Sequence, residues 1–216
     1  MNLIILGAPG SGKGTQGKVL AERLGLYYFE AGDFARHLSK SNEKIKKIVE
    51  SGQLIPEREM SGYVNEFLKN NVPEGKDILF DGYPRSEEQY LNLKKWLGQK
   101  QKKIDKAIFL EVNDNVVITR LSTRRVCESC GESFNLVTDP SAKPNVCDKC
   151  GGKLIQRFDD NTDDIKRRIL EYKLKTKPMI DLLVSDGILV KVNGEKSIDE
   201  ITQEIMGKLD QDYADN

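Results

Sequence analysis

The stretch with the most evident chemical potential is GAPGSGKGT, residues 7 to 15. It differs from the phosphate-binding pattern G-x-x-x-x-G-K-[ST] because Gly14 stands where a hydroxyl is expected and Thr15 follows one residue late. Glycines let backbone N–H groups turn toward an anion, the start of a helix adds a favourable dipole, and Lys13 adds a positive charge. A glycine-rich turn without function is the plainer alternative. The apolar run before the loop and the helical pattern after it favour phosphate binding.

Four cysteines form a second candidate site. Cys127 and Cys130 make one C-x-x-C pair and Cys147 and Cys150 make another, with residues 131 to 146 between them. Each pair places two thiolates on one side of a tight turn, so two pairs predict a tetrahedral, all-sulfur site for structural Zn²⁺. Two disulfides are the competing interpretation. The thiols of a cytosolic chain stay reduced, which favours the metal.

The segment FDGYPR, residues 80 to 85, ends a short apolar run. A carboxylate at the carboxyl end of a strand in a nucleotide-binding sheet commonly holds Mg²⁺, directly or through water. Asp81 is therefore a candidate magnesium residue. Arg85 follows closely, and a guanidinium binds phosphate oxygens through paired hydrogen bonds and stays charged.

Strand and helix patterns alternate along the chain, which predicts a parallel sheet flanked by helices. Strands are expected at residues 2–6, 26–29, 77–81, 106–112 and 188–192. Helices are expected at residues 14–24, 43–50, 57–70, 86–98, 114–126, 162–184 and 198–209, with Pro178 kinking or dividing the long helix. Residues 30–56 and 122–158 do not fit the alternation. We interpret them as small inserted domains.

The composition limits the possible partners. A chain of 216 residues favours one α/β core with insertions over two independent domains. Lys plus Arg and Asp plus Glu each total 34, so no overall field attracts nucleic acid or an anionic membrane. The apolar run after Met1 is too short for a signal peptide, and no stretch is long enough to span a bilayer. We therefore expect a cytoplasmic protein without nucleic-acid or membrane partners.

Five motifs together resemble those of the nucleoside monophosphate kinases, and most closely the long-lid bacterial adenylate kinases. They are GAPGSGKGT, AGDFAR, DGYPRSEEQ, RLSTRRVC and RFDDNTDDIKRRILEY, in that family's order and at about its spacing. The resemblance covers essentially the whole chain, and five motifs are far more specific than one. The phosphate loop of this family ends in Gly-Lys-Gly-Thr, so Thr15 supplies the late hydroxyl.

The resemblance implies an α/β fold of the P-loop type, with a five-stranded parallel sheet in the order 2-3-1-4-5 flanked by helices. The core would be residues 1–29, 57–121 and 159–216. Residues 30–56 would be a mobile insertion over the acceptor nucleotide, and residues 122–158 a mobile zinc-binding lid over the donor. The implied reaction is reversible, Mg²⁺-dependent phosphoryl transfer from ATP to AMP, giving two ADP. We expect a monomer.

The resemblance also assigns roles to individual residues. The ATP site would comprise Gly10, Ser11, Gly12, Lys13, Gly14, Thr15, Arg120, Arg124, Ser133, Phe134 and Lys196. The AMP site would comprise Ala31, Arg36, Ile55, Gly82, Arg85, Gln89, Arg157 and Arg168. The catalytic residues would be Lys13, Arg85, Arg124, Arg157 and Arg168. Asp81, Asp159 and Asp160 would act on magnesium through water. Without the resemblance, each single arginine would be read as a solvated surface residue.

One departure from the family concerns the acceptor base. Adenylate kinases usually read S-T-G-D where this chain reads E-A-G-D, with Glu30 and Ala31. Pyrimidine monophosphate kinases are similar there, with S-A-G-D. Gln89 instead matches the glutamine that reads the adenine edge. We weigh Gln89 and the long lid above Ala31, which leaves a UMP/CMP kinase as the alternative.

A second alternative comes from a different class of protein. C-x-x-C pairs also build zinc ribbons that bind nucleic acid, so the chain could be an ATP-dependent nucleic-acid factor. Such surfaces usually carry a basic stripe with interleaved aromatic residues. Residues 127–150 instead mix acids with bases: Glu128, Glu132, Asp139 and Asp148 against Lys143 and Lys149. This composition disfavours the ribbon interpretation.

Overall fold

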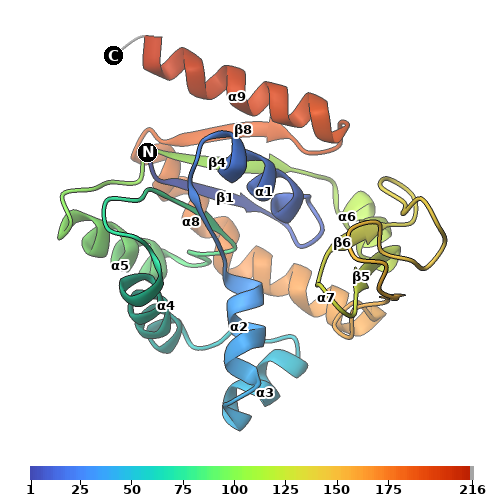
Figure 1. Ribbon diagram of the computed structural model, residues 1–216. Helices are drawn as coiled ribbons and strands as arrows, with labels where there is room; N and C mark the ends of the chain where they lie inside the picture. The colour runs from blue at the N-terminus through green and yellow to red at the C-terminus, as the bar shows by residue number, and fades with distance from the viewer. Residues whose placement is uncertain (215–216) are drawn as a thin grey trace.

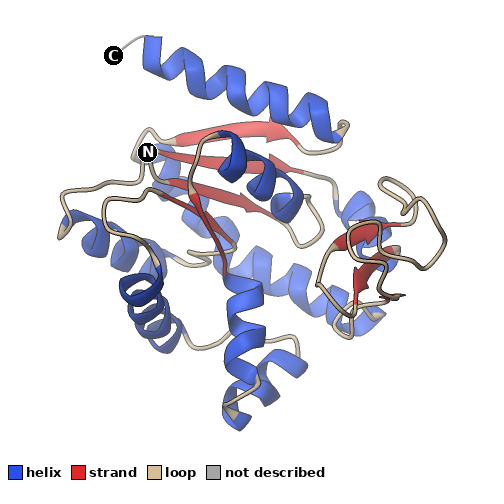
Figure 2. Cartoon of the chain, in the orientation of Figure 1, coloured by secondary structure: helices blue, strands red, loops and turns tan. Residues whose placement is uncertain are grey.

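A five-stranded parallel sheet forms the centre of the molecule (Figures 1 and 2). The structure is a computed structural model and describes residues 1–214. The strands of this sheet are β1 (Leu3–Gly7), β2 (Tyr27–Glu30), β3 (Ile78–Asp81), β4 (Lys106–Glu111) and β8 (Leu189–Asn193). Their order is β2-β3-β1-β4-β8, which confirms the predicted order 2-3-1-4-5 with β8 as the fifth strand of the core.

Helices cover both faces of the sheet because its strands carry apolar side chains on both faces, as β1 illustrates. Leu3 and Ile5 point to one face and Ile4 and Leu6 to the other, and all four are buried. The first face packs against α1 (Lys13–Arg23) and α9 (Ile198–Ala214). The second face packs against α4 (Glu57–Asn71), α5 (Glu87–Gly98) and α8 (Lys177–Ser185). Within residues 1–214, no helix combines the length and apolar character needed to cross a membrane.

Two helices follow β2 directly and project away from the sheet (Figure 1). They are α2 (Ala31–Ser39) and α3 (Glu43–Glu50). Asn42 ends the connection between them as the N-cap of α3, where its side chain accepts a hydrogen bond from Ile45 N at 3.2 Å. These helices make up most of the segment 30–56 that the sequence set apart.

The cysteine segment forms a separate antiparallel sheet beside α6 (Asp114–Ser122) and α7 (Thr162–Glu171) (Figure 1). Its strands are β5 (Arg124–Cys127), β6 (Ser133–Asn135) and β7 (Leu154–Ile155), in the order β6-β5-β7. The helix predicted for residues 114–126 was wrong beyond Ser122. Residues 124–127 pair with strands on both sides, and such non-local pairing overrides a local helical pattern.

The long helix predicted for residues 162–184 is divided, as Pro178 indicated. A five-residue π-helical segment, Tyr172–Thr176, separates α7 from α8, and Pro178 lies in the first turn of α8. Proline lacks the N–H that an uninterrupted helix would need at this position. The last helix, α9, continues to Ala214, beyond the predicted end at residue 209.

Candidate active site

The phosphate loop connects β1 to α1 at the carboxyl edge of the sheet. Gly10 and Gly12 have φ values of 78° and 96°, a left-handed conformation that favours glycine. Lys13 Nζ donates to Gly7 O at 2.9 Å and to Ala8 O at 2.8 Å, so the loop holds the ammonium group at the start of α1. Burial lowers the pKa of Lys13 to about 8, while the nearby charge of Asp81 opposes the decrease.

Two hydroxyls belong to the same loop. Ser11 Oγ is buried and has no hydrogen-bond partner among the described residues. Thr15 lies in the first turn of α1 and is exposed. The late hydroxyl is therefore accessible from the solvent side of the loop.

Asp81 ends β3 next to the phosphate loop and is only 4% exposed. Tyr28 OH donates to Asp81 Oδ2 at 2.8 Å, and burial raises the pKa of Asp81 against the opposing charge of Lys13. Tyr28 lies so close to α1 that a Cβ at Gly17 would be 2.7 Å from Tyr28 Cε2. Tyr28 is not among the site residues predicted from the sequence. Strand alternation could have turned one of the two adjacent tyrosines toward α1, but no sequence signal places its hydroxyl at Asp81.

Two aspartates and three arginines form a tight cluster where the cysteine segment joins α7. Arg124 Nε donates to Asp160 Oδ2 at 2.6 Å, and Arg168 Nη1 donates to Asp160 Oδ1 at 2.9 Å. Arg157 Nη2 donates to Asp159 Oδ2 at 2.7 Å. The side chain of Asp160 is completely buried. Although burial opposes the change, the charge of Arg157 lowers the pKa of Asp159 to about 2, so this carboxylate holds Arg157 in place as an anion.

Positive charge is in excess at this edge of the sheet. Lys13, Arg85, Arg124 and Arg168 lie close enough that each arginine lowers the pKa of the lysine. Burial, followed by the charge of Arg157, lowers the pKa of Arg168 to about 10. Together with Arg157 these are five cations, set against four carboxylates, those of Glu30, Asp81, Asp159 and Asp160. An anion with several negative charges would relieve the repulsion among the cations.

Arg85 and Gln89 are positioned together after β3. Arg85 Nε donates to Gly82 O at 2.7 Å, and Arg85 N donates to Gln89 Oε1 at 2.8 Å. Gln89 is 4% exposed, in the first turns of α5. Ala31 and Ile55 are buried in the apolar cluster beneath this region. The structure thus places the predicted base-reading glutamine beside the predicted phosphate-binding arginine.

Arg36 lies on α2 with two acidic partners. Its Nη2 contacts Glu30 Oε1 at 3.3 Å and also bonds to Asp33. Burial and the nearby Asp81 raise the pKa of Glu30 to about 7, although the charge of Arg36 opposes them. Glu30 departs from the family pattern, and the sequence predicted no role for it.

The predicted donor-base residues lie on the other side of the phosphate loop. Arg120 Nη1 donates to Gly194 O at 2.8 Å and borders a hollow of about 330 Å³ that Asn135 also lines. Ser133 and Phe134 lie on the adjacent strand β6, with Phe134 packed against the buried cysteines. Lys196 was also predicted to bind ATP. In the structure its ammonium group pairs with Glu204 of α9 at 2.8 Å.

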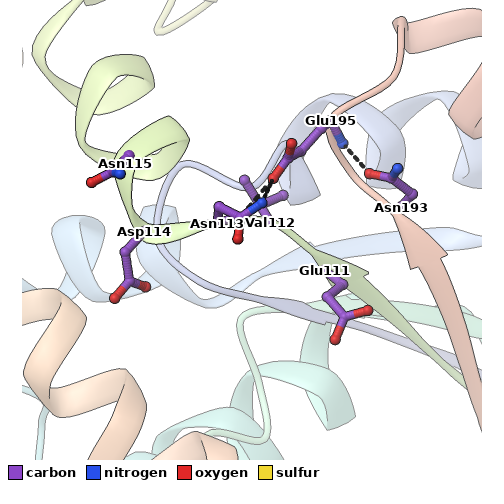
Figure 3. A pocket seen from close by; sticks show the side chains of 7 residues that line it. All are labelled: Glu111, Val112, Asn113, Asp114, Asn115, Asn193 and Glu195. Atoms are coloured by element: carbon purple, nitrogen blue, oxygen red, sulfur yellow. Dashed lines mark hydrogen bonds between the residues drawn. The ribbon is translucent and has the colours of Figure 1, made fainter.

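A larger hollow of about 740 Å³ lies where β4 and β8 end (Figure 3). Carboxylates of Glu111, Asp114 and Glu195 line it, and Glu195 Oε1 accepts hydrogen bonds from Asn113 N at 2.8 Å and Asn113 Nδ2 at 2.6 Å. An acidic lining repels phosphate groups. This hollow is therefore a poor site for a nucleotide's phosphates, despite its size.

The four cysteines converge at one point, with all four sulfur atoms within 4.8 Å of one another. Cys127 Sγ lies 3.4 Å from Cys150 Sγ, and Cys130 Sγ lies 3.6 Å from Cys147 Sγ. A disulfide would require a separation of about 2.05 Å. Tetrahedral Zn²⁺ with Zn–S distances of about 2.3 Å places its sulfur ligands about 3.8 Å apart. The arrangement fits a zinc site.

Comparisons with known proteins agree with this geometry. The model of the family described as adenylate kinase matches residues 5–188. The protein named adenylate kinase from Caldicellulosiruptor saccharolyticus is 38% identical over 216 residues, which cover 97% of this chain and 99% of that protein. Those from Fervidobacterium nodosum and Bacillus licheniformis are 40% and 37% identical, covering 93% and 95% of this chain and 94% and 96% of their own lengths. On the strength of these matches and of the shared sheet order, the chain belongs to the adenylate kinase family.

Proposed function

We propose that this protein transfers the γ-phosphoryl group of ATP to AMP and forms two molecules of ADP. The observation that carries the proposal is the convergence of Lys13, Arg85, Arg124, Arg157 and Arg168 at the carboxyl edge of the sheet. Membership of the adenylate kinase family supports it, and the comparisons favour neither a UMP/CMP kinase nor a zinc-ribbon factor. We further propose that the protein acts as a monomer on nucleotides alone.

Phosphoryl transfer requires little covalent chemistry from the protein. It requires two anions held in line, neutralisation of charge, and the exclusion of water that would hydrolyse ATP. Residues 10–15 and Lys13 would hold the donor phosphates, and Arg36 and Arg85 the acceptor phosphate. Arg124, Arg157 and Arg168 would surround the group in transfer. Closure of the segments 30–56 and 122–158 would exclude water.

The two aspartates after the lid are assigned a positioning role. Asp160 binds Arg124 and Arg168, and Asp159 binds Arg157, so the arginine forks are already oriented before any nucleotide arrives. Preorganised donors lower the cost of reorganisation in the transition state. The two carboxylates would also accept hydrogen bonds from water bound to magnesium and so orient it.

Asp81 is the residue best suited to act on Mg²⁺. Its buried carboxylate ends a strand next to the phosphate loop, and Tyr28 fixes one of its oxygens. Hard oxygen ligands suit Mg²⁺, which often keeps its water shell and binds proteins through one or two carboxylates. When bound, Mg²⁺ would neutralise charge on the donor phosphates.

The cysteine cluster is proposed to hold structural Zn²⁺. Four thiolates leave no open position for substrate, so the metal would take no part in the chemistry. It would stabilise β5, β6 and β7. These strands form only a small sheet, and its apolar cluster contains few buried residues: Cys127, Cys147 and Leu154. The lid could then move as a rigid unit.

The proposed reaction has a direct test. Purified protein incubated with ATP, AMP and Mg²⁺ should form two ADP for each AMP consumed, measured by chromatography of the nucleotides. Chelation of Mg²⁺ should abolish the product. Release of inorganic phosphate from ATP without any conversion of AMP would contradict the proposal.

Compared with a threonine at the same position, Ala31 should give weaker binding of AMP without changing which base is preferred. Ala31 is 3% exposed at the start of α2, and a threonine there would add a hydroxyl that can bond to the base. One side-chain hydrogen bond contributes about 0.5–1.5 kcal/mol, so Ala31→Thr should lower the KM for AMP by a few-fold up to about tenfold. Steady-state kinetics in both proteins would check this. An unchanged or higher KM would exclude the base contact.

Gln89→Leu should reduce kcat/KM for AMP by roughly tenfold or more, because the adenine edge would lose a paired donor and acceptor. The variant also loses the bond to Arg85 N, which would impair every acceptor equally. The ratio of AMP to CMP activity therefore isolates the base contact. Gln99→Leu, on an exposed residue at the end of α5, is the matched control. An unchanged ratio in Gln89→Leu would show that Gln89 does not read the base.

A further inference from the structure

Glu30 lies among the arginines assigned above to the acceptor phosphate. Its carboxylate contacts Arg36 at 3.3 Å. Its charge also acts on two further guanidinium groups: burial lowers the pKa of Arg85 and Glu30 is among the charges that oppose this decrease, while the pKa of Arg157 is raised, against burial, by Asp159 above all and by Glu30 to a smaller extent. Its side chain is 25% exposed, and a Cβ at Gly32 would be 3.5 Å from Glu30 Oε1. The carboxylate thus lies over the first turn of α2, where the partial positive charge of a helix start favours an anion.

We propose that the carboxylate of Glu30 competes with the acceptor's phosphate for Arg36. The proposal rests on the function proposed above. When no AMP is bound, the Glu30 carboxylate would pair with the Arg36 guanidinium, to which the phosphate of AMP must bind. Binding of AMP would then require the Glu30 side chain to swing away from the phosphate.

A purely structural role explains Glu30 less well. It is the N-cap residue of α2, yet its side chain makes no capping hydrogen bond. It is not needed to orient Arg36, because Asp33 on the same helix already binds the same guanidinium nitrogen. Glu30 also faces other acids, since Asp81 pairs with it across β2 and β3 and Asp33 follows one turn later. Glu30 is thus close to two other carboxylates and bonded to an arginine that Asp33 already holds. We infer that its charge lowers the affinity of this site for a phosphate.

The consequence is a reduced affinity for phosphate-bearing acceptors. A site that is free only part of the time binds with its intrinsic affinity multiplied by the free fraction. Like charges also repel at short range, so a phosphate entering beside an ionised Glu30 meets an added barrier. The penalty applies to AMP and is absent for adenosine, which carries no phosphate.

The test is equilibrium binding of AMP and adenosine to the parent protein and to Glu30→Gln at pH 8, by isothermal titration calorimetry. Glutamine keeps the size of the side chain and removes its charge. We expect the variant to bind AMP about tenfold more tightly, and adenosine with unchanged affinity. In kinetics, the KM for AMP should fall by a similar factor, with kcat changed by less than about twofold.

Two further variants complete the test. Asp33→Asn removes the other partner of Arg36, but the Asp33 side chain is 69% exposed, so solvent screening should limit its effect on AMP to about twofold. Glu30→Ser removes the same charge, can cap α2, and should reproduce the effect of Glu30→Gln.

Weaker AMP binding in Glu30→Gln, or equal shifts for AMP and adenosine, would overturn the proposal and show Glu30 to be a supporting residue. That result would leave the proposed function intact as long as the parent protein converts AMP. A parent that does not convert AMP would overturn both.

Discussion

Replacing Lys13 with methionine should lower turnover by about 100-fold or more while the protein stays folded. Lys13 Nζ lies inside the phosphate loop, bonded to Gly7 O and Ala8 O, and no other lysine in residues 7–15 could replace its charge. Loss of one preorganised electrostatic contact to a transition state typically has an effect of this size. Methionine retains most of the aliphatic stem, so the packing at the start of α1 should survive.

The measurement is kcat with saturating ATP and AMP, accompanied by circular dichroism and thermal unfolding. Lys69→Met, on an exposed residue in the last turn of α4, is the matched control and should leave kcat unchanged. A Lys13→Met protein with nearly normal turnover would show that the loop is not part of the catalytic machinery.

Removal of zinc should unfold the lid locally and leave the central sheet intact. Structural zinc contributes on the order of 10 kcal/mol to the folding of small metal-bound units, and the lid's apolar cluster is too small to replace it. Amide hydrogen exchange in β5 should therefore accelerate by at least about 100-fold after chelation, while β1 and β4 keep their protection. The melting temperature should also fall.

Metal analysis should find one zinc per chain in carefully reduced protein. Cys147→Ser should lose this zinc, whereas Ser129→Ala, between two of the cysteines, should retain it. Reduced parent protein without zinc, or a chelated protein with unchanged exchange in β5, would disprove the structural role of the metal.

The sheet order could be predicted because the phosphate loop and the other four motifs resemble a family whose fold is known. Local signals also sufficed for the division at Pro178, where a missing N–H must interrupt a helix. Residues 124–127 show the limit of local patterns. Their local pattern predicts the end of a helix. In the fold they form a strand, because they pair with residues 133–135 and 154–155.

The site shows the same division between local and non-local information. The resemblance supplied the residue types and their expected roles. It could not supply the pairing of Arg124 and Arg168 with Asp160, because this contact joins positions up to 36 apart in the chain. Nor could it supply Tyr28 at Asp81, since Tyr28 reaches that carboxylate only because Gly17 leaves room on α1.

The choice of AMP as phosphoryl acceptor can be tested by the ratio of kcat/KM for AMP to that for CMP and for UMP, with ATP as donor. Gln89, buried at 4% exposure beside Arg85, predicts a ratio well above one for both pyrimidines, because a pocket with buried polar groups rejects a base that leaves them unpaired. A ratio below one would show that AMP is not the preferred acceptor, and Ala31 would then be the better guide to the base that the acceptor site selects.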